Sequence, residues 1–210
     1  MSRQAANRGS ARDAQGAENT SGSADLHRLV RYSHIFASAV REILEAKLLR
    51  EVTSFPLTVS QFHLLKLMAF NGRHQLGEVA DFLGVSPPAA TKNVDKLEGL
   101  GLVVRRPSKG DRRATLLSVS PKGRRLVRKY EELKVTRLSP VLESFRPEEI
   151  EQLSQLLERF ALALLCLEAS ESEFCLRCAV YIESGCALGQ IHGGCPYQKA
   201  RQTRSGATDA

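Results

Sequence analysis

The stretch that decides the fold runs from Gln75 to Ser120 and reads QLGEVADFLGVSPPAATKNVDKLEGLGLVVRRPSKGDRRATLLSVS. Its first half predicts two short helices joined by a turn at Gly84, because apolar residues recur at helical spacing on both sides of that glycine. Ser86 suits the N-cap of the second helix, and Pro87 fits its first position, where a missing N–H costs nothing. These signals predict a helix-turn-helix.

A strand-like hairpin follows the second helix. Its two runs are Leu102 to Arg106 and Thr115 to Ser120, and a basic turn joins them. A basic hairpin directly after a helix-turn-helix is typical of a winged helix. The predicted fold class is therefore mainly α with a small β-hairpin wing (α+β), a winged helix-turn-helix with long N- and C-terminal dimerisation helices.

The second helix has one apolar and one polar face. Ala90, Val94 and Leu97 point to a core. The rest of the helix carries small, polar or cationic side chains, which can reach base edges and phosphates in a major groove. The predicted DNA contacts here are Ser86, Pro87, Ala89, Thr91, Lys92, Asn93 and Lys96.

A set of residues in this stretch resembles the MarR family of bacterial regulators, and the likeness extends over roughly Leu26 to Leu167. The set comprises Ser86, Thr91-Lys92, Val94-Asp95, Leu97-Glu98, Gly101-Leu102-Val103, Arg105, Asp111-Arg112-Arg113, Leu117 and Gly123. Its most specific part is the wing pattern, an Asp followed two residues later by Arg.

The resemblance implies a homodimeric winged-helix protein that binds double-stranded DNA, usually a repressor released by a small ligand or by oxidation. It places Arg113, held by Asp111, in a minor groove beside the major-groove helix. It also implies a small-molecule pocket between the dimerisation helices and the winged helix. The predicted DNA contacts of the wing are Arg105, Lys109, Asp111, Arg112 and Arg113.

The charge distribution agrees with an anionic partner. The chain of 210 residues has a net charge of +7, and the segment from Ser86 to Arg137 holds fourteen Lys or Arg against five Asp or Glu. A basic excess on the proposed DNA-binding unit is what counterion release requires. The alternative interpretation is a solubilising charged face.

Long amphipathic helices flank the helix-turn-helix. One is expected from Asp25 to about Leu49, and a capping box from Thr58 to Gln61 begins another. A helix opens at Pro121 and should kink or end at Pro140. The last helix carries apolar residues at alternating spacings of three and four: Ile150, Leu153, Leu157, Phe160, Leu164 and Leu167. This coiled-coil-like seam predicts burial against a second subunit, the alternative being intramolecular packing.

A cysteine-rich extension follows the last helix. Cys175, Cys178, Cys186 and Cys195 give the pattern C-x2-C-x7-C-x8-C, which suits a metal or cluster. The irregular spacing, with a proline after the last cysteine, favours a four-iron four-sulfur cluster over structural zinc, with redox-active thiols or a disulfide as a third alternative. His192 could replace one ligand but is better interpreted as lying near the site. Cys166, within the last helix, is expected to be a small buried hydrophobe.

The expected organisation is a disordered tail at 1–24, a winged-helix domain with dimerisation helices at 25–168, the cysteine-rich extension at 169–198 and a disordered tail at 199–210. Neither a signal peptide nor an apolar run long enough to span a bilayer is visible, so a cytoplasmic location is expected. Gly-rich phosphate loops, nucleophile elbows and paired metalloprotease histidines are absent from the sequence, which argues against an enzyme. The expected function is a sequence-specific DNA-binding regulator, a repressor that binds a near-palindromic operator as a homodimer and is switched by the iron–sulfur cluster. The alternative is a regulator switched by a small organic ligand, with the cysteine extension a structural zinc site or a protein-interaction module.

Overall fold

The computed structural model describes residues 10–107, 115–167 and 177, with side chains from residue 23 onward. It divides into two compact units, Met1–Lys47 and Leu48–Ala210. The first unit contains helix α1 (Ser10–Ala39) and a π-helical segment, η1 (Val40–Lys47). Helix α1 begins upstream of the expected Asp25, so residues 10–24 are helical where the sequence predicts disorder; a helix, once nucleated, adds polar residues at little cost.

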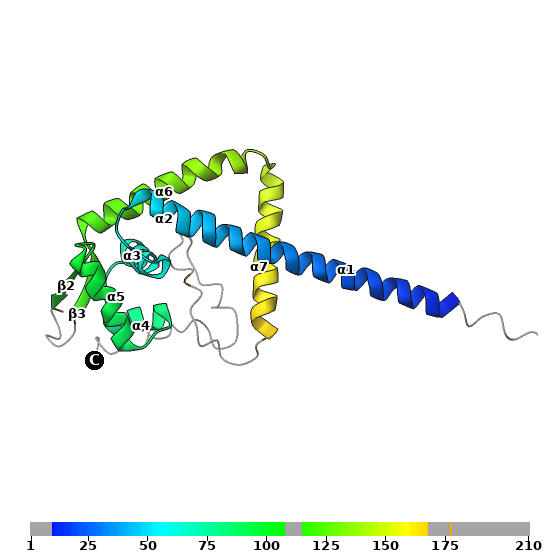
Figure 1. Ribbon diagram of the computed structural model, residues 1–210, viewed down its shortest axis with the longest axis horizontal. Helices are drawn as coiled ribbons and strands as arrows, with labels where there is room; N and C mark the ends of the chain where they lie inside the picture. The colour runs from blue at the N-terminus through cyan, green and yellow to red at the C-terminus, as the bar shows by residue number, and fades with distance from the viewer. Residues whose placement is uncertain (1–9, 108–114, 168–176, 178–210) are drawn as a thin grey trace, which may run out of the picture. The chain divides into compact units, whose positions relative to one another are not determined.

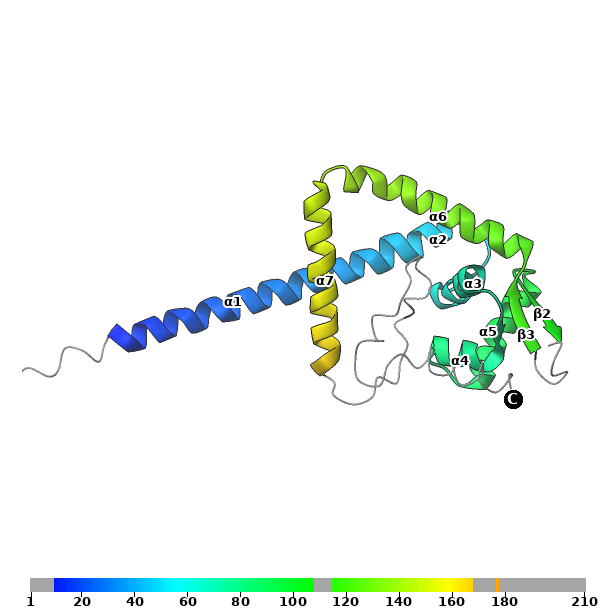
Figure 2. The same cartoon turned by 180° about the vertical axis from the view of Figure 1, so that it is seen from behind.

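The second unit holds the winged helix. Its elements are α2 (Leu48–Val52), α3 (Val59–Asn71), β1 (His74–Gln75), α4 (Leu76–Leu83), α5 (Pro87–Gly99), β2 (Val103–Pro107), β3 (Thr115–Val119), α6 (Pro121–Leu142) and α7 (Pro147–Leu167). Figure 1 and, from behind, Figure 2 show α3, α5 and the hairpin on one side of α6, with α4 the farthest of these elements from it. The predicted fold class, mainly helical with a β-hairpin wing, is confirmed.

The local signals explain most of these boundaries. Thr58 accepts a hydrogen bond from the Gln61 amide at 3.2 Å, and the Gln61 side chain accepts one from the Thr58 amide at 3.2 Å, so the predicted capping box begins α3. Gly84 adopts a left-handed conformation (φ 64°) between α4 and α5, and Gly101 (φ 69°) does so between α5 and β2. Both turns need a residue without a Cβ.

The sheet has three antiparallel strands in the order β1-β3-β2. In the wing, Val103 pairs with Val119 and Arg105 with Leu117. Sequence analysis missed β1, because two residues are too short to show a periodicity. His74 is fully buried there, and its Nδ1 lies 3.2 Å from the Glu78 carboxylate.

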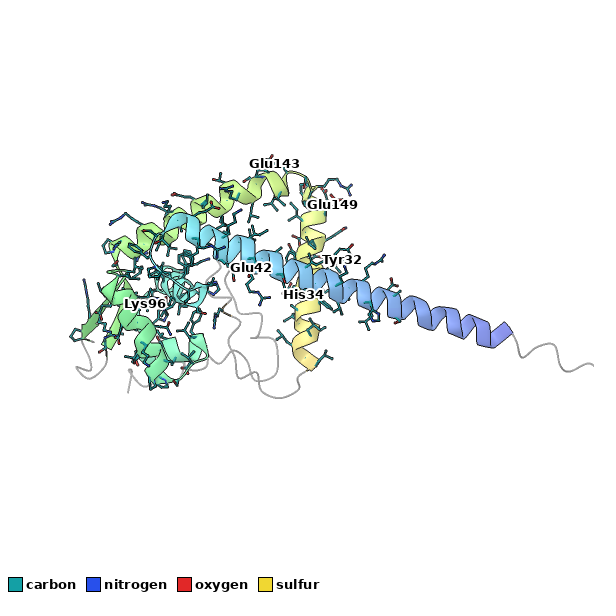
Figure 3. The ribbon with its side chains drawn as sticks, in the orientation of Figure 1. Tyr32, His34, Glu42, Lys96, Glu143 and Glu149 are labelled. Carbon is teal, nitrogen blue, oxygen red and sulfur yellow. The ribbon has the colours of Figure 1, made fainter. Side chains whose placement is uncertain are left out.

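The core lies among α3, α4, α5, α6 and the sheet. Its largest fully buried apolar side chains are Leu64, Leu65, Leu67, Met68, Val79, Phe82, Val94, Leu97, Leu102 and Leu117. Helix α6 continues two residues beyond Pro140, because a proline in the final turn leaves most of the preceding helix intact. Glu143 and Glu149 mark the turn between α6 and α7 (Figure 3).

Helix α7 has no buried residue. Along its seam, Leu153, Leu157, Leu164 and Leu167 are all exposed. Cys166 is exposed as well, contrary to the expected buried position. Among the described residues, no helix is both long enough and apolar enough to cross a membrane.

Candidate nucleic-acid interface

Helix α5 is fixed to the core by its apolar face. Ala90, Val94 and Leu97 are fully buried, as the helical spacing predicted. This leaves Lys92 and Lys96 exposed on the outside of the helix, where they carry positive charge toward solvent. Lys96 is labelled in Figure 3. A helix anchored in this way can present its outer face to a DNA groove.

The N-terminus of α5 has few amide donors. Pro87 and Pro88 occupy its first two positions and have no N–H, so two of the four amides that usually remain free at a helix start are missing. Ser86 is the N-cap residue, as predicted, but its hydroxyl makes no capping hydrogen bond. Because Ser86 is exposed, its hydroxyl can instead donate a hydrogen bond to a phosphate of bound DNA.

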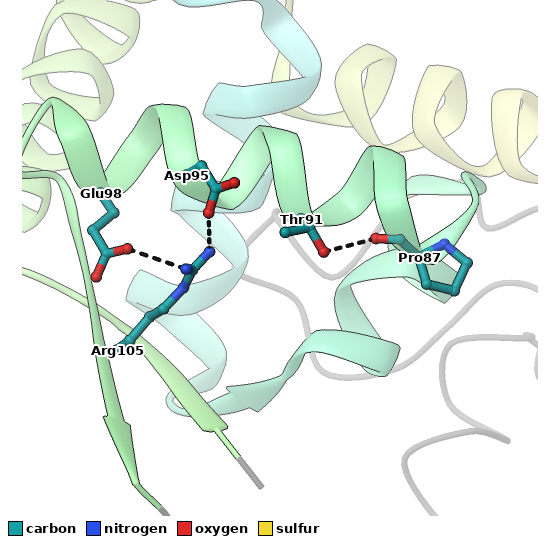
Figure 4. Close-up of polar contacts among 5 residues, drawn as sticks. All are labelled: Pro87, Thr91, Asp95, Glu98 and Arg105. Atoms are coloured by element: carbon teal, nitrogen blue, oxygen red, sulfur yellow. Dashed lines mark hydrogen bonds and ion pairs between the residues drawn. The ribbon is translucent and has the colours of Figure 1, made fainter. Parts of the chain in front are cut away.

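Two of the predicted contact residues on α5 are engaged within the protein. The Thr91 hydroxyl donates to the Pro87 carbonyl at 3.0 Å (Figure 4). The Asn93 amide donates to the Ala89 carbonyl at 2.9 Å and accepts from Gln61 of α3 at 3.1 Å. Asn93 therefore ties α5 to the start of α3, and a base contact by Asn93 stays a prediction.

Arg105 joins the wing to the recognition helix. From strand β2 its guanidinium forms a short ion pair with Asp95 and a second with Glu98 at 3.4 Å, both on α5 (Figure 4). Its side chain is 33% exposed, so one edge still faces solvent. The structure thus places this predicted DNA contact between the wing and α5, where it fixes their relative position.

The tip of the wing and, apart from Arg177, the cysteine extension lie outside the described residues. This applies to Lys109, Asp111, Arg112 and Arg113, and equally to Cys175, Cys178, Cys186, Cys195 and His192. Within the described part of the chain, no three His, Cys, Asp or Glu side chains gather as a metal site would require. The metal assignment therefore rests on the sequence of the extension.

A buried ion pair supports the helices behind the interface. Lys66 of α3, with a side chain 3% exposed, lies 2.7 Å from Glu131 of α6, which also pairs with Lys134. Burial raises the pKa of Glu131, but hydrogen bonds from Lys134 and Lys66 outweigh it, and the pKa lies below its usual value. Sequence reasoning missed this pair, because its members are far apart in the chain.

The winged-helix segment matches known proteins. A family model described as the MarR family matches residues 57–115. An uncharacterized HTH-type transcriptional regulator, YkoM of Bacillus subtilis (strain 168), is 24% identical over 135 residues, which cover 64% of this chain and 87% of that protein.

Solved structures share the fold. A MarR family protein from Bacillus stearothermophilus is 26% identical, with 70% of this chain and 97% of that chain covered at a TM-score of 0.55. Streptococcus pneumoniae FabT, solved in complex with DNA, is 22% identical, with 68% and 99% covered at a TM-score of 0.59. About a third of this chain lies outside each of these likenesses.

Proposed function

We propose that the chain is a winged-helix transcriptional regulator of the MarR family, and that it represses transcription by binding a near-palindromic operator as a homodimer. The observation that carries the proposal is the exposed cationic face of α5 beside the β2-β3 hairpin, with the helix anchored by a buried apolar face. FabT, which shares the fold, was solved bound to DNA. Here, α5 would enter the major groove and the wing would reach the minor groove.

The homodimer interface would bury apolar side chains that are exposed in the single chain. Leu157 and Leu164 of α7 are 37% and 49% exposed on a helix with no buried residue. In the first unit, Leu29 and Phe36 of α1 are exposed as well. Exposed apolar side chains on each of these helices favour an interface with a partner subunit. Two subunits would present their α5 helices to successive major grooves, about 34–36 Å apart.

The switch would be the cysteine extension. Four thiolates in an irregular spacing suit a four-iron four-sulfur cluster, which would sense redox state, oxygen, nitric oxide or iron. The alternative is a structural zinc site, or a protein-interaction module, in a regulator that a small organic ligand controls. The exposed dimer helices would then line the ligand pocket.

DNA binding is tested with single alanine variants on a duplex that the wild-type protein selects from a random library. Lys92→Ala should weaken binding and lower the salt slope, d log K/d log [salt], by about one, because one phosphate contact is lost. Arg128→Ala removes the same charge from α6 and should leave the slope unchanged. Equal slopes for wild type and Lys92→Ala would remove α5 from the DNA interface.

The switch is tested by iron, sulfide and zinc content after purification without air. About four irons and four sulfides per chain, with a visible band that bleaches in air, support the cluster. One zinc per chain without colour supports the alternative. Operator affinity that is equal with and without the cluster would show that the cluster is not the switch.

A further inference from the structure

Arg177 is the one residue of the cysteine extension that the structure describes, and it contacts the helix-turn-helix unit. Its guanidinium donates to the Ser60 hydroxyl at 3.2 Å and to the Leu83 carbonyl at 3.0 Å. Ser60 lies in the first turn of α3, and Leu83 is the last residue of α4. One side chain from the extension therefore bridges the start of one helix and the end of another.

The site suits a guanidinium. The last carbonyls of a helix have no partner within the helix, and the negative end of the helix dipole favours a cation there. Gly84, which follows Leu83, turns the chain away in a left-handed conformation. A planar group with several N–H donors can bind this carbonyl and the nearby Ser60 hydroxyl at once.

The backbone at Arg177 indicates a constrained position. Its φ of 59° is the only positive value at a non-glycine residue in the described chain. Such a conformation persists when its surroundings hold it. In sequence, Arg177 lies between Cys175 and Cys178, so a metal or cluster bound by both thiolates would constrain the backbone on either side.

We propose that the cysteine-rich extension docks on the helix-turn-helix through Arg177, with Ser60 and the Leu83 carbonyl as its acceptor site, and that this contact couples the extension to the recognition helix. Two adjacent residues of α3 connect the extension with α5. Ser60 accepts the hydrogen bond from Arg177, and Gln61 donates one to the Asn93 side chain of α5 at 3.1 Å. The start of α3 thus touches the extension on one residue and the recognition helix on the next.

Docking itself is tested on the full-length protein without metal, by pulse alkylation with N-ethylmaleimide and mass spectrometry. Arg177→Ala should speed the labelling of Cys175 and Cys178 several-fold, since it removes both hydrogen bonds, and Ser60→Ala should speed it to a smaller extent, since the bond to the Leu83 carbonyl remains. Cys166, on α7, serves as the internal reference and should label at an unchanged rate. Equal rates at Cys175 and Cys178 in wild type and both variants would overturn the proposal. Ser60→Ala leaves the extension's own sequence intact, so a folding defect in the extension cannot explain its effect.

Coupling is tested with the same variants on the selected duplex, and this part rests on the proposed function. After anaerobic loading with iron and sulfide, the wild-type ratio of loaded to unloaded affinity defines the response. Arg177→Ala should reduce that response, Ser60→Ala should reduce it less because the hydrogen bond to the Leu83 carbonyl remains, and the double variant should match Arg177→Ala. Additive losses, or full response in both variants, overturn the coupling. If loading the cluster leaves the operator affinity of the wild-type protein unchanged, the proposed cluster switch is wrong. The alkylation rates then still decide whether the extension docks.

Discussion

Gly123 lies where the wing returns to the helices. A Cβ at this position would lie 2.3 Å from the Leu102 carbonyl oxygen and 2.9 Å from a methyl group of Val119. The approach is this close because Ser120 caps α6 through the Gly123 amide at 3.0 Å, while its own amide donates to Leu102 at 2.9 Å. The constraint belongs to the backbone, so side-chain movement cannot relieve it.

Gly123→Ala should therefore destabilise the fold by about 1–3 kcal/mol, the usual cost of overpacking. Urea unfolding followed by circular dichroism measures this. Gly99→Ala is the matched control, since nothing lies within 4 Å of its added Cβ and its φ is not positive. The control should lose no stability, because alanine favours a helix more than glycine does. Equal midpoints for the two variants would contradict the contact described here.

Glu131 gives the stability a pH dependence. Its pKa is lowered below the usual 4.5 in the folded protein, so its contribution to stability is present above that value and is lost as the pH falls through the folded pKa. Glu131→Gln should destabilise the protein at pH 7, because Lys66 would keep its buried charge without a carboxylate partner.

The difference between wild type and Glu131→Gln should shrink as the pH falls below about 4.5, measured by urea unfolding at each pH. Glu132→Gln is the control. Its carboxylate pairs with Arg128 at 3.7 Å, with both side chains largely exposed, and such pairs contribute little. A constant difference for Glu131→Gln down to acid pH would contradict the ion pair as its source.

The recognition helix and the wing act as one element because Arg105 joins them. Its contacts with Asp95 and Glu98 hold strand β2 against α5 (Figure 4). Arg105→Ala should weaken operator binding by misplacing the wing, with a smaller change in salt slope than Lys92→Ala causes. Fluorescence anisotropy at several salt concentrations measures both quantities, and Arg106→Ala, one residue later in β2, is the control. A fall of about one in the slope for Arg105→Ala would show that Arg105 leaves its carboxylates and contacts a phosphate in the complex.

The oligomeric state of the protein depends on what covers the exposed apolar seam of α7. If the seam is the dimer interface, Leu157→Lys combined with Leu164→Lys should yield monomers in analytical ultracentrifugation, because four charges would be buried at the interface. Operator binding should fall strongly, since one subunit reaches only one half-site. Gln152→Lys combined with Gln155→Lys adds the same charge to exposed polar positions of α7 and should leave the dimer intact. A persistent dimer in the leucine variant would place the interface elsewhere.

The sequence by itself determined the helix-turn-helix, the capping box at Thr58, the turn at Gly84 and the hairpin. The helical features depend on periodicity and on hydrogen bonds between residues at most four apart, and the two strands of the hairpin are neighbours in sequence, so a short stretch contains the information. The buried residues of α5 followed from the same periodicity.

Only the tertiary structure decided which side chains meet across the chain. The pairing of His74 with Leu117, the hydrogen bond between Gln61 and Asn93, and the contact of Arg177 with Leu83 each join residues from separate elements. No local pattern encodes them, because they depend on how several helices pack at once. The sequence therefore identified a DNA-binding winged helix, and the packing of its elements showed which side chains hold the recognition helix in place.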